Sequence, residues 1–160
     1  MRSKTRKATA RRKANAHTAA DSDPSREAVY SWESSWKEWN TNSLSLTACR
    51  ALVRRACRAY RVAHPAVKQH GDGLSWSVPA LMKISLQSES RTPGNGGKNK
   101  ATALHEAAHH IAYHRYGERI QDHGPTFLAI FMGLLADFGA APAEALAASA
   151  RKHGLRWRKL

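Results

Sequence analysis

Hydrophobic residues recur at helical spacing in the first half of this chain. The first predicted helix begins at Asp23-Pro24, and its apolar positions at i, i+3, i+7 and i+10 are Val29, Trp32, Trp36 and Trp39. We interpret this tryptophan stripe as core rather than as a surface for base stacking. A second helix is predicted over residues 46 to 63, ended by Pro65. Its apolar face leaves five arginines elsewhere around the helix: Arg50, Arg54, Arg55, Arg58 and Arg61.

The pattern changes to short runs typical of strands between residues 66 and 86. Three strands are predicted, over residues 66 to 69, 74 to 78 and 82 to 86. Gly71-Asp72-Gly73 marks the first turn, and Pro79 lies near the second. A small sheet among several helices predicts an α+β fold that is mainly helical. The three-stranded sheet precedes, in sequence, the helix that begins after residue 99.

Helical spacing returns after residue 99. Asn99 is a candidate N-cap and Gly117 a stop signal, and Leu104, Ala108 and Ile111 form an apolar stripe between them. A strongly apolar helix follows over residues 127 to 138, with Pro125 suited to its first turn. The last helix is predicted over residues 142 to 153, closed by Gly154.

Charge is concentrated at the start of the chain. The 160 residues carry a net charge of +14, and half of it lies in residues 1 to 20, which hold seven Lys or Arg and no acid. We therefore predict a disordered basic arm over residues 1 to 22 and one folded domain over residues 23 to 160. The arm could bind nucleic acid without sequence specificity, or it could act only as a solubilising tail.

Composition also bounds the compartment. No run approaches the roughly 20 apolar residues of a membrane span, and the N-terminus lacks the apolar core of a signal peptide. We therefore expect no membrane partner and a cytoplasmic location. Cys49 and Cys57 lie eight residues apart on one predicted helix, too far for a mutual disulfide, and we expect both to be reduced packing residues.

The most informative motif is His105-Glu106-Ala107-Ala108-His109. On a helix, residues four apart lie one above the other, so both imidazoles can reach one ion. Glu106 projects about 100° around the helix, where it can hold a water molecule. This spacing indicates half of a zinc hydrolase site, which needs a third protein ligand and an open fourth position.

Several later residues are candidates for that third ligand. His114 lies one position short of the metzincin spacing, so we reject it. Glu118 and Asp122 fall in a connecting loop, where a solvated carboxylate is the simpler interpretation. Glu144 lies in an alanine-rich run that resembles the start of an exposed helix, and it remains a distant second choice.

His123 is the preferred third ligand. It lies directly before the apolar helix, at an entrance where a ring can be directed toward an ion. The first helix rises about 10 Å beyond His109, and the six residues 117 to 122 can span up to about 20 Å on the way back. We therefore predict that His105, His109 and His123 bind zinc.

These residues resemble a known family. The HEAAH motif, followed fourteen residues after its second His by His123-Gly124-Pro125-Thr126-Phe127, is similar to SprT-like zinc metallopeptidases. It most closely resembles small putative metallohydrolases of actinobacteria and their phages. The resemblance implies a zincin-like fold, three His ligands to zinc and Glu106 as the catalytic carboxylate. It also implies that the strand before the HExxH helix, here residues 82 to 86, lies at the cleft edge and pairs with an extended peptide.

Peptide hydrolysis by a metal-activated water is the activity that we expect. Glu106 would act as general base toward a protein or peptide substrate, which could be associated with nucleic acid. Two other functions stay open. The chain could be a non-catalytic, zinc-stabilised module that binds nucleic acid, or a metal-free interaction protein whose His pair is incidental.

Overall fold

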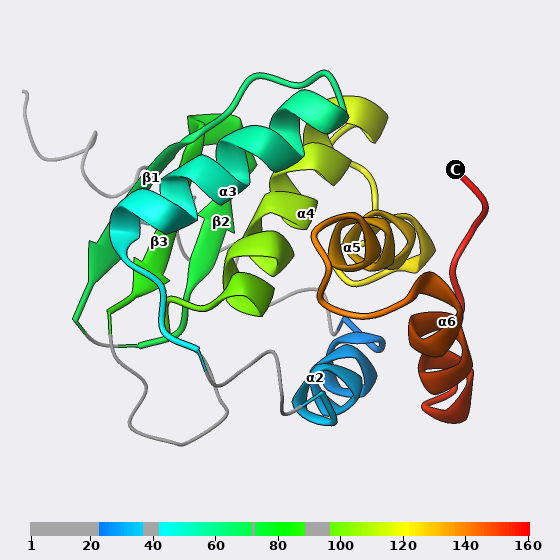
Figure 1. Cartoon of the computed structure of the whole chain (residues 1–160). Coiled ribbons are helices and arrows are strands. Elements are labelled where there is room, and N and C mark those ends of the chain that lie inside the picture. The colour runs from blue at the N-terminus through cyan, green and yellow to red at the C-terminus, as the bar shows by residue number, and fades with distance from the viewer. Residues whose placement is uncertain (1–22, 37–41, 72, 89–96) are drawn as a thin grey trace, which may run out of the picture.

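The computed structural model describes residues 23–36, 42–71, 73–88 and 97–160. Those ranges form an α+β fold of five α-helices and one three-stranded sheet (Figure 1). The elements are α2 (Arg26–Ser34), α3 (Leu46–Ala59), β1 (Ala66–His70), β2 (Trp76–Val78), the 3₁₀ turn η2 (Pro79–Leu81), β3 (Lys83–Gln87), α4 (Lys100–Tyr116), α5 (Pro125–Asp137) and α6 (Ala143–Lys152). The predicted arm, Trp39 and Asp72 lie outside the described residues.

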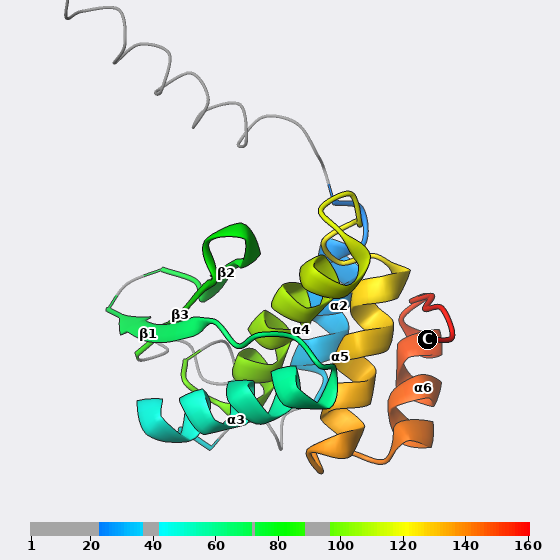
Figure 2. The same ribbon diagram turned by 90° about the horizontal axis from the view of Figure 1, so that it is seen from above.

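Helix α4 is the central element of the fold. It packs against the sheet and α3 on one side and against α5 on the other, and α5 separates it from α6 (Figure 2). Its predicted stripe of Leu104, Ala108 and Ile111 is fully buried. Helix α2 joins this core through Trp32, whose ring meets that of Phe131 on α5 edge to face at 6.0 Å. Val29 and Trp32 of the predicted stripe are therefore core, and Trp36, which lies beyond the end of α2, is partly buried against it.

The sheet has the order β1-β3-β2, with β1 parallel and β2 antiparallel to β3. The prediction that the strand over residues 82 to 86 forms the cleft edge is wrong, because β3 is paired on both sides. The one-turn connection η2 folds β2 back onto β3, and β1 occupies the other side. Ile84, Ser85 and Leu86 are accordingly buried in succession, as in a central strand.

Helix α3 ends earlier than predicted. It stops at Ala59 rather than at residue 63, so Pro65 is not what ends it. Arg61 adopts a left-handed conformation (φ 56°), and the Val62 N–H donates to the Cys57 carbonyl at 3.0 Å. This six-residue closure satisfies the last carbonyls of the helix without a proline. Cys49 and Cys57 are buried on α3 as free thiols, as predicted.

The predicted start and stop signals of the two site helices are confirmed, although α5 runs over Pro125–Asp137 rather than over residues 127 to 138. The Asn99 side chain accepts a hydrogen bond from the Thr102 N–H at 2.8 Å, and α4 ends at Gly117, whose φ is 91°. Pro125 occupies the first position of α5. The motif therefore lies mid-helix and His123 lies just before the next helix. No helix in the described ranges is both long and apolar enough to cross a bilayer.

Candidate metal centre

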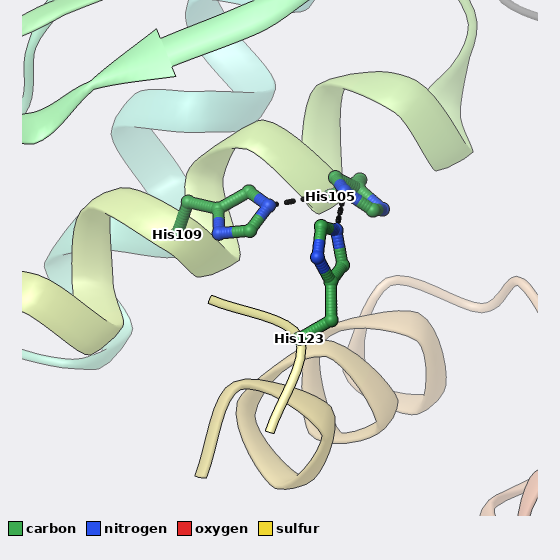
Figure 3. Close-up of side chains that lie close together, drawn as sticks. All are labelled: His105, His109 and His123. Carbon is green, nitrogen blue, oxygen red and sulfur yellow. Dashed lines mark hydrogen bonds between the residues drawn. The ribbon is translucent and has the colours of Figure 1, made fainter. Parts of the chain in front are cut away.

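Three histidines from two segments converge at one point. His105 and His109 extend from the same face of α4, and His123 approaches from the residue before the N-cap of α5 (Figure 3). Nε2 of His105 lies 3.2 Å from Nε2 of His109 and 3.3 Å from Nε2 of His123. The three side chains form a group that could hold a metal ion.

The spacing of these nitrogens fits a tetrahedral ion. With Zn–N bonds of about 2.0–2.1 Å, two ligands on a tetrahedral zinc lie about 3.3 Å apart. The two Nε2 distances from His105 match that separation. The residues present therefore fit a metal ion of this size, held by three imidazoles.

Two carboxylates fix the orientation of two of the rings. Nδ1 of His105 lies 3.1 Å from Oε2 of Glu33, and Nδ1 of His123 is hydrogen-bonded to Oδ2 of Asp23. An ionised carboxylate can only accept, so each Nδ1 carries the proton and each Nε2 of a neutral ring presents a lone pair. While both rings are neutral, no proton then lies between the Nε2 atoms of His105 and His123. Two lone pairs that face each other at 3.3 Å favour a bound cation.

The third ring is held by packing. The His109 ring stacks on Phe127, with centroids 4.3 Å apart and an interplanar angle of 28°. Burial lowers the pKa of His109 well below its ordinary value, and the charges of His105 and His123 lower it further. Its neutral form, which is the form that binds a metal, is therefore favoured.

The other two ligands show opposite shifts. Burial lowers the pKa of His105, but the charge and hydrogen bond of Glu33 outweigh that effect, so its net shift is upward. Burial and the charge of His105 lower the pKa of His123 more than Asp23 raises it. Asp23 itself has a lowered pKa, because its hydrogen bonds to His123 and Gln121 outweigh the effect of its burial.

Glu106 is buried beside the three histidines. Burial raises its pKa to about 7, partly offset by the charge of His105. It shares with the three rings the wall of a cavity of about 730 Å³. Other groups line the same cavity and could contact a ligand there: Arg26, Glu27, Tyr30, Trp76, Tyr113 and Glu118. Because Trp76 and Ser77 are among its walls, the sheet edge nearest the site is β2 rather than β3.

None of the alternative ligands belongs to the group formed by the three histidines. Glu118 and Asp122 line the cavity but do not belong to the group that could hold an ion, and Glu144 is exposed on α6. His114 is exposed, with Nε2 3.2 Å from the Pro79 carbonyl oxygen. His110 is fully buried, with Nε2 2.8 Å from the Ala63 carbonyl oxygen.

Comparisons with protein-family models, with curated proteins and with solved structures found no match to this chain. Its function is therefore argued from the site itself.

Sequence reasoning missed the contribution of α2. Asp23 and Glu33 bond to His123 and His105, and the Tyr30 ring lies 5.7 Å from that of His105 and 5.2 Å from that of His123. A signal was present, because Asp23, Arg26, Tyr30 and Glu33 have the same i, i+3, i+7, i+10 spacing as the tryptophan stripe. It indicates a second, polar face of the helix.

Proposed function

We propose that this protein is a zinc-dependent metallopeptidase in which His105, His109 and His123 hold the metal and Glu106 is the general base. One observation carries the proposal: the three convergent imidazoles and the buried carboxylate share one open cavity. A structural zinc site is closed by four protein ligands, whereas a catalytic site keeps a position for water or substrate. Only a catalytic site gives a reason for Glu106 at this place.

The chain's own residues would perform the following steps. His105, His109 and His123 would hold a zinc ion, which would supply Lewis acidity toward a water molecule and a substrate carbonyl. Glu106 accepts the proton from the attacking water and delivers it to the leaving amine. Because Glu106 is buried, bulk water does not compete for the proton on its carboxyl group. Tyr30 and Tyr113, which line the cavity, are available to donate a hydrogen bond to the developing oxyanion.

The SprT-like resemblance and a zincin-like fold belong to this proposal. Both are supported by the HExxH motif at mid-helix and by a third His at the entrance of the next helix. An extended peptide would pair with the exposed edge of β2, since this edge strand lines the cavity.

A paired measurement of zinc content and peptide hydrolysis tests the proposal. Glu106→Gln should keep stoichiometric zinc and lose hydrolysis of an unfolded protein substrate by about 10²- to 10⁴-fold. Glu144→Gln, which changes an exposed carboxylate on α6, is the matched control and should retain both. His123→Ala should lose the zinc. Equal hydrolysis by wild type and Glu106→Gln would contradict the role of Glu106.

A second function is favoured by a separate observation. Helix α3 carries four arginines and no acid, and Arg54 and Arg58 are exposed with no carboxylate partner among the described residues. Such a face can contact nucleic-acid phosphates. A zinc-stabilised module that binds nucleic acid without catalysis is therefore the alternative, and it predicts stoichiometric zinc with no hydrolysis by wild type.

A further inference from the structure

The polar face of α2 is directed at the metal site. The stretch from Asp23 to Glu33 places a carboxylate at each end, and each bonds to a different histidine of the candidate centre. An adjacent face of the helix carries Val29 and Trp32, both fully buried in the core. The segment that contains α2 therefore contacts both the core and the candidate metal ligands.

We propose that Asp23 and Glu33 are positioning residues that hold His123 and His105 for metal binding, so that docking of α2 and binding of the metal are coupled. The inference rests on the metal site of the proposed function, but it does not depend on peptide hydrolysis. The two positioning carboxylates are not part of the HExxH motif.

The hydrogen bonds select the atom that faces the ion. Each imidazole can coordinate through either nitrogen, and a carboxylate on Nδ1 leaves Nε2 as the ligand. Both carboxylates are largely withdrawn from water, with exposed side-chain fractions of 15% for Glu33 and 14% for Asp23. Charge-assisted hydrogen bonds in such surroundings are strong and hold the rings in place.

The three ligands differ in what orients them. His109 is held by its place on α4 and by stacking on Phe127, and no carboxylate of the described residues bonds to it. His105 is held by Glu33 on α2, across 72 residues of sequence, and His123 by Asp23 just before α2, across 100 residues. Two of the three ligands therefore reach the metal-binding geometry only when α2 is docked.

The coupling operates in both directions. Coordination at Nε2 makes the Nδ1–H a stronger donor, so a bound metal should strengthen both bonds to α2. Loss of the metal should conversely loosen α2 relative to α4 and α5. Thermodynamic linkage requires both effects to have the same magnitude.

Zinc affinity of full-length variants, measured by competition with a chelator, tests the proposal. Asp23→Ala and Glu33→Ala should each weaken zinc binding by about 10- to 100-fold. Asp23→Asn and Glu33→Gln keep an acceptor oxygen and should restore part of the affinity. Glu27→Gln is the matched control. Glu27 lies on the same helix and lines the cavity but bonds to none of the three histidines, so this variant should bind zinc as wild type does.

Two further readouts separate positioning from a general loss of structure. The cobalt-substituted protein should show altered d–d absorption bands in Glu33→Gln, which retains the shape of the side chain. In wild type, zinc should slow amide hydrogen exchange across α2, and Asp23→Ala/Glu33→Ala should lose that protection while α6 stays unchanged.

The outcomes are distinguishable. Zinc affinities within twofold of wild type in both alanine variants would overturn the positioning role and leave the metal centre standing. A wild-type protein that binds no zinc would overturn the positioning role and the proposed function together. Coupling in a protein that hydrolyses no peptide would support the positioning role and contradict only the peptidase.

Discussion

At the scale of single residues, Glu106 lies in surroundings that disfavour its charge when no metal is bound. Burial raises its pKa to about 7, and the neighbouring Glu33 adds to the shift. A carboxyl with such a pKa is partly protonated at neutral pH. A bound cation would favour the ionised form that a general base requires.

This environment predicts a pH-dependent effect of Glu106→Gln on the metal-free protein. The folded pKa of about 7 exceeds the ordinary 4.5, so the folded state binds the proton more tightly and loses stability as pH rises from about 4.5 to about 7. Glu106→Gln should therefore raise the free energy of unfolding at pH 8, by at most about 3 kcal/mol. At pH 4 it should change little.

Urea unfolding in the presence of a chelator, at both pH values, measures this difference. The substitution also removes the effect of Glu106 on the pKa of His105, so the comparison reports on the coupled pair of Glu106 and His105. An equal effect of the substitution at pH 4 and pH 8 would show that the pKa of Glu106 is not raised.

At the scale of elements, local signals predicted most of the fold. The cap at Asn99, the stop at Gly117 and the first-turn Pro125 placed both site helices, because these signals act within one turn of the chain. The end of α3 could not be predicted in this way. Arg61 adopts a left-handed conformation although it is not glycine, so the sequence carries no ordinary stop signal at that position.

The end of α3 gives a second prediction. A non-glycine residue in the left-handed region costs about 1 kcal/mol or more, whereas glycine adopts it freely but loses more chain entropy on folding. Arg61→Gly should therefore keep the free energy of unfolding or raise it by up to about 1 kcal/mol. Arg58→Gly, within the helix, is the matched control and should lower it by about 1 kcal/mol. Equal destabilisation by both, measured by thermal unfolding, would place Arg61 within a helix that continues past Ala59.

The same limit explains why the strand over residues 82 to 86 was wrongly expected at the cleft edge. The three strands were found from their composition, but which strand lies in the centre depends on pairing between segments. Strand β1 pairs in parallel with β3, although β2 lies between them in the sequence. Such pairing leaves no local sequence signal.

At the scale of the whole molecule, the candidate site combines residues from distant parts of the chain. The HExxH spacing and His123 could be predicted because their geometry follows from one helix and one short loop. Asp23 and Glu33 lie 100 and 72 residues from the ligands that they contact, so only the packing of α2 reveals them.

The distribution of charge over the molecule gives a third prediction. Deletion of residues 1 to 22 removes seven cations and retains Asp23. Because each phosphate contact adds about 0.9 to the log–log salt slope on duplex DNA, the deletion should reduce that slope by up to about 6 and leave zinc content unchanged. Equal DNA affinity and salt slope of the full-length and truncated chains, measured by fluorescence anisotropy, would assign the arm a solubilising role.

X-ray absorption at the zinc edge of the full-length, zinc-loaded protein tests the central claim most directly. The account predicts one zinc per chain, with three imidazole nitrogens at about 2.0–2.1 Å and one exchangeable oxygen in the fourth position. A fourth protein ligand that closes the site would contradict a catalytic centre. A protein that retains no stoichiometric zinc would contradict the metal centre itself.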